Sequence, residues 1–248
     1  MYLPTPNNLL VLSALVSITF AHPQPLHKRL ASLNMGLAST YGAVSSSTLT
    51  STGATVVTGS CGTCPGTSIT GFPPGVCSVT TSAGGTVACD AKAACLTAYN
   101  LALSLPVTSA LPSASLAGLT LTPGVYTFPS AAASLTGSVT LSGEGQFVFK
   151  IDTAFTTAAA SKVVLTGGAK ACDVYWVVGS SATVGAASEL AGNILAYASV
   201  SRGVLHSLAC SFIKCANRAA TNAGTWCALN GAVTLINNKL TAQTSCVV

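Results

Sequence analysis

Between Gly145 and Ile236 the chain reads GQFVFKIDTAFTTAAASKVVLTGGAKACDVYWVVGSSATVGAASELAGNILAYASV over residues 145–200 and AVTLI over residues 232–236. Short apolar runs alternate with corners made of glycine, serine, threonine and alanine. The predicted strands are Gln146–Ile151, Ala154–Thr157, Lys162–Thr166, Asp173–Val178, Ala182–Val184, Glu189–Ala198 and Ala232–Ile236. Because short strands at near-even spacing bury their inner faces by stacking on one another, the pattern predicts a β-solenoid.

One segment outside this region has helical character. Cys89–Leu105 is rich in alanine and leucine, Asp90 is expected at or near its N-cap, and Pro106 prevents its continuation. Its apolar residues lie nearly all round the helix, so we expect it to be buried against one flank of the solenoid. That flank is expected to carry five large residues, which also suit a core: Phe147, Phe149, Tyr175, Trp176 and Leu195.

The composition indicates a surface that works without charge. The 248 residues suffice for one all-β domain, and only 6% of them are charged, whereas soluble domains carry roughly a quarter. Serine, threonine, alanine, glycine and asparagine must therefore cover much of the surface. The net charge of +5 comes from scattered lysines and arginines that form no stripe with aromatic residues, so nucleic acid is not an expected partner.

The first 29 residues read as targeting and processing segments. Residues 1–21 are interpreted as a signal peptide because the apolar run Leu9–Ala21 is too short to span a bilayer. Residues 22–29 are a possible propeptide that ends at a dibasic Lys28-Arg29 site, which leaves residues 30–248 as the folded domain. The sequence thus predicts a secreted, extracellular, monomeric protein without membrane insertion.

Ten cysteines follow the leader, and an even number in a secreted chain indicates disulfides. Five of them fall in one stretch and are expected to cap the first coils, with most of them oxidised: Cys61, Cys64, Cys77, Cys89 and Cys95. The Cys61-x-x-Cys64 spacing also suits metal or redox chemistry, but no strong second pair accompanies it. We therefore expect disulfides, with no metal or cofactor, while their connectivity stays open.

Five blocks of sequence, taken together, resemble the ice-binding-like family: Thr67–Gly75, Leu119–Tyr126, Gly168–Thr183, Ala191–Ala196 and Asn230–Leu235. They occur in the family's order and cover nearly all of residues 33–240. The resemblance implies an irregular right-handed β-helix of triangular section with a long helix along one side, and binding to ice crystals that inhibits their growth or recrystallisation. Gly203–Ala219, with Cys210 and Cys215, departs from the family pattern and reads as a disulfide-pinned insertion or as a gene-model error.

Two solenoid faces are candidates for ice contact. The preferred face is free of charge and carries Thr156, Thr183, Ser199, Ser201 and Thr234. The alternative face carries Val164, Thr166, Ala191, Asn193, Thr221 and Ala223, and there Lys162 and Glu189 are expected to pair on adjacent coils. Threonine is stiff at χ1, and its methyl and hydroxyl groups on a flat sheet form a grid that orders water. The competing interpretation is that threonine is simply favoured in strands.

Other function classes have weaker support. The five acidic residues of the chain form no close pair, and His206 is the single histidine after residue 29. Glycosidase and serine-hydrolase chemistry need such groups together, so we do not expect an enzyme. An extracellular adhesin or cell-wall-associated structural protein of the same fold is the alternative function.

Overall fold

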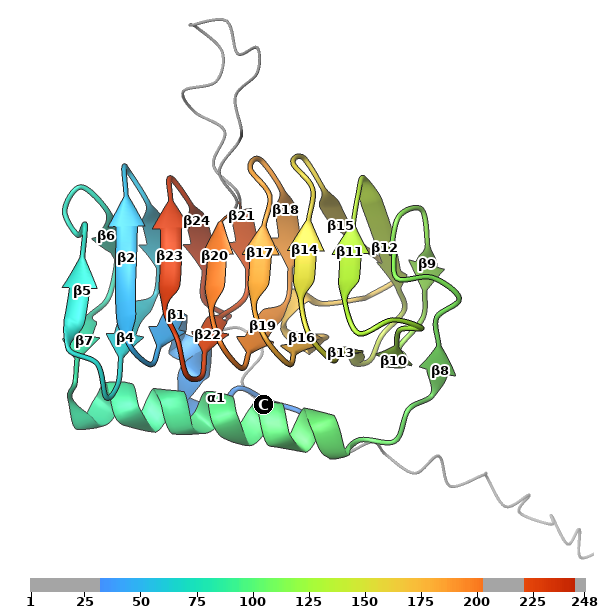
Figure 1. Cartoon of the computed structure of the whole chain (residues 1–248), viewed down its shortest axis with the longest axis horizontal. Coiled ribbons are helices and arrows are strands. Elements are labelled where there is room, and N and C mark those ends of the chain that lie inside the picture. The colour runs from blue at the N-terminus through green and yellow to red at the C-terminus, as the bar shows by residue number, and fades with distance from the viewer. Residues whose placement is uncertain (1–31, 203–220, 244–248) are drawn as a thin grey trace, which may run out of the picture. The chain divides into compact units, whose positions relative to one another are not determined.

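A computed structural model describes residues 32–202 and 221–243 of the chain, so the predicted signal peptide and propeptide lie outside the described residues. The described residues form three parallel β-sheets, named A, B and C, and one long α-helix (Figure 1). Each complete coil contributes one strand to each sheet in turn, whereas β7, β8 and β9 belong to incomplete coils at the two ends. The predicted β-solenoid with three sides and a flanking helix is therefore confirmed.

In spatial order, sheet A contains β7 (Thr81–Ala83), β4 (Ser60–Thr63), β1 (Tyr41–Ser45), β22 (Trp226–Ala228), β19 (Asn193–Ala196), β16 (Val174–Val178), β13 (Phe147–Ile151), β10 (Gly124–Thr127) and β8 (Ser109–Ala110). Sheet B contains β11 (Ala133–Leu135), β14 (Phe155–Thr157), β17 (Ala182–Val184), β20 (Val200–Arg202), β23 (Val233–Ile236), β2 (Thr48–Thr52) and β5 (Ser68–Thr70). Sheet C contains β6 (Val76–Cys77), β3 (Val56–Thr58), β24 (Lys239–Thr241), β21 (Thr221–Ala223), β18 (Glu189–Ala191), β15 (Lys162–Thr166), β12 (Ser138–Ser142) and β9 (Thr120–Leu121).

The coils do not stack in the order of the sequence. The first coil, β1–β2–β3, pairs in all three sheets with the last, β22–β23–β24. The second coil, β4–β5–β6, lies beyond the first, and α1 then carries the chain from β7 at one end of the stack to β8 at the other (Figure 1). Residues 41–58 therefore occupy the interior of the stack rather than its end.

The helix α1 spans Thr86–Ser104 and packs along the outer side of sheet A. It begins three residues before the predicted Cys89, and its N-cap is Gly85, so the expectation for Asp90 is wrong. Small residues at helical spacing form the buried face: Ala88, Ala91, Cys95, Ala98 and Ala102. Their size lets the helix approach the sheet closely along its whole length. The described residues also include two short 3-10 helices, η1 (Gly36–Thr40) and η2 (Ala171–Asp173).

The five large residues predicted to receive the helix divide between two sides of sheet A. Phe147, Phe149 and Trp176 belong to the solenoid core. Tyr175 and Leu195 are equally buried but lie outside that cluster, on strands β16 and β19, which α1 contacts. Strand alternation explains the division, because successive side chains point to opposite faces of a sheet.

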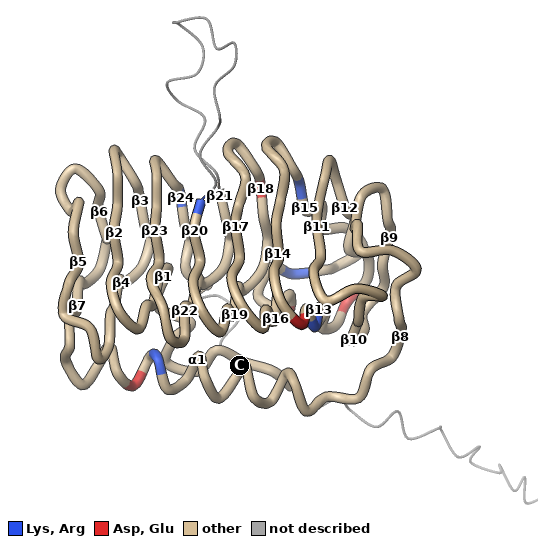
Figure 2. Tube along the Cα trace, viewed as in Figure 1, with Lys and Arg blue, Asp and Glu red and all other residues tan. Residues whose placement is uncertain are grey.

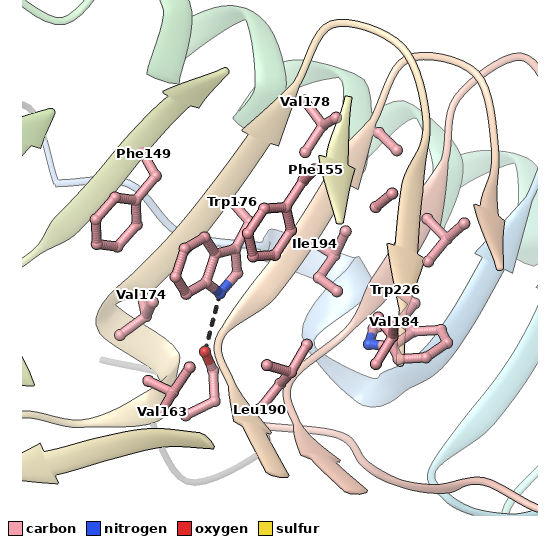
Figure 3. Close-up of a cluster of buried hydrophobic side chains, with 14 of the residues drawn as sticks. Phe149, Phe155, Val163, Val174, Trp176, Val178, Val184, Leu190, Ile194 and Trp226 are labelled. Atoms are coloured by element: carbon pink, nitrogen blue, oxygen red, sulfur yellow. Dashed lines mark hydrogen bonds between the residues drawn. The ribbon is translucent and has the colours of Figure 1, made fainter. Parts of the chain in front are cut away.

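Aromatic side chains form the centre of the solenoid (Figure 3). The rings of Tyr126, Phe149, Trp176 and Phe155 stack in series, with centroid separations of 5.5, 4.3 and 4.8 Å. The indole Nε1 of Trp176 donates a hydrogen bond of 3.0 Å to the carbonyl oxygen of Ala191. These contacts tie sheet A to sheet B through Phe155 and hold the strands in a fixed register.

All five cysteines of the predicted N-terminal group are disulfide-bonded, which confirms the prediction. Cys61 pairs with Cys77 and Cys64 pairs with Cys89, which joins the second coil to itself and to the start of α1. The third bond, Cys95–Cys227, joins the middle of α1 to β22. Cys61 and Cys64 thus have different partners and do not form a CxxC redox pair.

Candidate functional site

Outward side chains of sheet B form one continuous column of hydroxyl groups. The parallel registers align, from one end of the stack to the other, Ser115, Ser134, Thr156, Thr183, Ser201, Thr234, Thr50 and Thr70. All of them except Thr70, which follows the half-buried Ile69, lie next to a buried residue, as in the Phe155–Thr157 strand, where Thr156 alone is exposed. The column has eight members and no gap.

Shorter rows of small polar residues lie beside this column. Thr48 pairs with Ser68 on the neighbouring strand. Ser199 lies two residues before Ser201, so it faces the same side, and its hydroxyl accepts a hydrogen bond from the Ala232 amide. Thr52, at the other end of β2, is also exposed. The face of sheet B, defined by the column and these flanking residues, is most densely hydroxylated over β2 and β5.

The face of sheet B is nearly free of charge. Within its seven strands the charged residue is Arg202, the last of β20, and its guanidinium donates to the carbonyl oxygen of Ile236. Figure 2 shows the strands of sheet B uncoloured apart from that end of β20. The interior under the column is apolar, with Phe155, Val200 and Leu235 fully buried. The outward residues of sheet B therefore present methyl and hydroxyl groups above an apolar interior.

Sheet C differs because one of its outward rows carries charges. Lys162 pairs in register with Glu189, and their side chains form an ion pair of 2.6 Å, as predicted. Thr221 and Lys239 continue the same row. Both members of the pair are more than half exposed, so it adds little to stability.

The alternative set of site residues does not form one face. Val164, Thr166, Thr221 and Ala223 do occupy outward positions of sheet C. Ala191 is only 6% exposed, and Asn193 is fully buried on β19 of sheet A.

The prediction that Asn193 lies on the outer face of sheet C is wrong for a local reason. The predicted strand Glu189–Ala198 is broken at Gly192, whose φ of +115° turns the chain from sheet C to sheet A. Alternation therefore does not carry across this corner. The Asn193 amide instead donates to the carbonyl oxygens of Cys172 and Val174 and accepts from the Thr225 amide, so its role is to join adjacent coils.

The structure adds residues that the preferred set omitted. Thr50, Thr70 and Ser134 belong to the same column as Thr156, Thr183, Ser201 and Thr234. The sequence contains a signal for Thr50 and Thr70, because TLT at residues 48–50 and SIT at residues 68–70 alternate hydroxyl and apolar side chains. What it lacks is any indication that these strands stack on the C-terminal coil.

The described part of the chain contains no group of three histidine, cysteine, aspartate or glutamate side chains that would suit a metal ion. Within the same residues, no helix is both long enough and apolar enough to cross a membrane. The arrangement that the structure does present is a solvent-facing array of hydroxyl and methyl groups.

The comparisons with known proteins all match ice-binding proteins. The sequence model of a family described as ice-binding-like matches residues 43–241. An ice-binding protein of Nostoc sp. (strain HG1) is 41% identical over 215 residues, which cover 85% of this chain and 74% of that protein. The crystal structure of an ice-binding protein from the Antarctic ascomycete Antarctomyces psychrotrophicus is 39% identical, with a TM-score of 0.75 over 86% of this chain and 99% of that one. An ice-binding protein from an Antarctic biological consortium is similar at 36% identity and a TM-score of 0.73, over 84% and 90% of the two chains.

Proposed function

This chain belongs to the ice-binding-like family, and from that premise we propose that it is a secreted protein that adsorbs to ice through the face of sheet B. The unbroken column of eight serine and threonine residues carries this proposal. Secretion is supported by the apolar leader at residues 9–21 and by disulfides, which persist in oxidising compartments.

The spacing of the column suits a crystal surface. Neighbouring strands lie about 4.8 Å apart and alternate residues of one strand about 6.6–7 Å apart, so eight coils extend over about 34 Å. Threonine in a strand has few χ1 rotamers, which fixes its methyl and hydroxyl groups before contact. The surface therefore loses little conformational entropy on adsorption.

The difference in hydration between the two faces explains why the face of sheet B is preferred over sheet C for ice binding. Methyl groups favour ordered water around them, while a neighbouring hydroxyl holds that water by hydrogen bonds. Such a layer is able to merge with an ice plane. The Lys162–Glu189 pair and Lys239 hydrate strongly and irregularly, which opposes the same ordering on sheet C.

The test is to observe ice crystals in solutions of the purified mature protein. Faceted growth and slow recrystallisation are expected with the wild type, and both should be lost in Thr183→Tyr and Thr234→Tyr, because a bulky ring lifts the face off the crystal. Ala191 is unsuitable as a control since it is buried, so the matched control is Thr166→Tyr, an exposed position of sheet C. Rounded crystals that coarsen as in buffer would refute ice binding and favour the adhesin. If ice activity is lost in Thr166→Tyr but kept in the two sheet B variants, the ice-binding site lies on sheet C.

A further inference from the structure

One polar residue interrupts the apolar interior of sheet C. Asn222 occupies the inward position of β21, a strand that begins just after the predicted insertion Gly203–Ala219, which lies outside the described residues. Its register neighbours are Leu190 on β18 and Leu240 on β24, and both belong to the hydrophobic core. Asn222 is only 2% exposed. An amide buried at such a position loses its bonds to bulk water and must regain them inside the protein.

The amide of Asn222 does not regain these bonds from other side chains or from the backbone. Within the described residues, neither its Oδ1 nor its Nδ2 has a hydrogen-bond partner, and the same holds for Nδ2 of Asn238, which is 1% exposed. Asn238 Oδ1 accepts a hydrogen bond of 2.6 Å from the Ile236 amide, so its Nδ2 is a donor without an acceptor. Buried amide atoms without partners are rare in native proteins, which indicates that a further polar molecule completes these bonds.

The two asparagines are diagonal neighbours on the inner side of sheet C. Asn222 pairs in register with Leu240, and Asn238 precedes Leu240 by two residues, so both asparagine side chains face the interior. One strand spacing and one step of two residues separate their Cα atoms by about 8 Å. The two side chains make no bond to each other, and a span of this size accommodates a bridging water.

An indole donor from sheet A faces the same part of the interior. Trp226 is fully buried, and its Nε1 also has no partner among the described residues. Trp176 lies in register two strands away on sheet A and reaches across the interior to the Ala191 carbonyl at the end of β18, and Figure 3 shows this bond for Trp176 and none for Trp226. Two strands from β18 on sheet C lies β24, next to β21. The register therefore directs the Trp226 indole toward the two asparagines.

We propose that the solenoid binds one buried water molecule between Asn222, Asn238 and Trp226. The water donates a hydrogen bond to Asn222 Oδ1 and accepts one each from Asn238 Nδ2 and Trp226 Nε1, which gives the three bonds typical of a buried water. Of the four unpartnered atoms, Asn222 Nδ2 alone receives no bond from it. The water joins the coil that ends in β21 to the last coil, on which the first coil stacks. The site is inside the protein and is independent of ice binding.

Electron density provides the direct test. In a high-resolution crystal structure of the secreted protein, we expect a single water peak within about 2.5–3.2 Å of Asn222 Oδ1, Asn238 Nδ2 and Trp226 Nε1. A structure without that peak would overturn the proposal. A direct hydrogen bond between the two asparagine amides would overturn it as well, because no water would then be needed to join the two strands.

A measurement in solution checks the site by another route. Magnetic relaxation dispersion of the water oxygen counts the long-lived internal waters of the protein. Asn222→Leu continues the row formed by Leu190 and Leu240, and we expect it to lower that count by one water. The matched control is Asn230→Leu, at an exposed corner, which should keep the wild-type count. An unchanged count in folded Asn222→Leu would contradict the proposal, and if that variant does not fold, the density of the wild type decides.

Discussion

Thr50 and Thr58 are the same residue type on one coil but belong to different sheets. Thr50 lies in the hydroxyl column of sheet B and accepts a hydrogen bond of 3.4 Å from the Thr70 hydroxyl. Thr58 is exposed on sheet C. We expect Thr50→Tyr to remove most inhibition of recrystallisation and Thr58→Tyr to leave it unchanged.

Both substitutions should change the free energy of unfolding by less than about 0.5 kcal/mol, because outward positions contribute little to the core. Ice-recrystallisation assays and thermal unfolding of the two variants provide the measurement. Equal loss of activity in both would mean that the N-terminal coil does not contribute through sheet B.

Tyr175 makes the free energy of unfolding depend on pH in the alkaline range. Burial, and secondarily the charge of Asp173, raises the pKa of the Tyr175 phenol, and its hydroxyl donates to the Leu33 carbonyl at 2.9 Å. The neutral phenol is therefore favoured in the folded state. Its contribution is complete below the unfolded-state pKa of about 10 and is lost as pH rises above it.

Urea unfolding of wild type and Tyr175→Phe between pH 8 and pH 11 tests this linkage. We expect the free energy of unfolding of the wild type to fall more steeply above pH 10 than that of the variant, which has no proton to lose. Tyr197→Phe is the control, since the Tyr197 side chain is half exposed rather than buried. Parallel pH profiles for wild type and Tyr175→Phe would contradict the assignment.

Lys150, on strand β13 of sheet A, caps the C-terminus of α1. The Lys150 ammonium donates to the carbonyl oxygens of Leu103 and Leu105 at 2.7 and 2.5 Å. These carbonyls have no partner within the helix, and a cation near a helix C-terminus also interacts favourably with its dipole. Desolvation lowers the pKa of Lys150, consistent with its partly buried position under the helix.

We expect Lys150→Met to reduce the free energy of unfolding by about 1–2 kcal/mol, because two carbonyls lose a charged donor while the apolar stem is kept. Lys239→Met, at an exposed position of sheet C, should change it by less than about 0.5 kcal/mol. Urea denaturation of both variants measures the difference. If Lys150→Met is as stable as the control, the bond is not needed to hold the helix.

Individual elements could be predicted well where residues alternate without interruption. Lys162–Thr166 and Ala182–Val184 were predicted with their observed bounds, since each has apolar residues at every second position and a glycine after it. The predicted element boundaries were wrong at two corners where the sequence does not clearly separate one element from the next. Gly192 divides a predicted strand in two, and Gly85 rather than Asp90 precedes the helix. At Gly192 the positive φ that glycine tolerates fixes the boundary, whereas no side-chain cap marks the start of α1.

At the scale of the molecule, the order of coils could not be read from the sequence. The segment TLT at residues 48–50 alternates hydroxyl and apolar side chains, but nothing in it specifies pairing with Val233–Ile236. The candidate site was therefore predicted only in part. Four of its column residues follow from alternation within the C-terminal coils, while Thr50 and Thr70 required the stacking order.

The Cys95–Cys227 bond joins regions 132 residues apart. Replacing both cysteines by alanine should lower the free energy of unfolding by about 2–4 kcal/mol, since the unfolded chain regains the freedom that the crosslink removes. Ice activity near 0 °C should remain, because the bond lies on the helix side of sheet A. Chemical denaturation and ice-shaping assays measure the two quantities. Unchanged stability would mean that packing alone fixes α1.

The placement of the first coil against the last has a consequence for synthesis of the protein. As the polypeptide emerges, β1, β2 and β3 lack one of their two neighbours until β22, β23 and β24 have been translated. The native stack therefore cannot be completed from the N-terminus onward, and pairing across so many residues is slow. For most of translation the nascent chain exposes an unpaired strand edge. Assistance from chaperones would matter most until β22, β23 and β24 have been synthesised and can pair with the first coil.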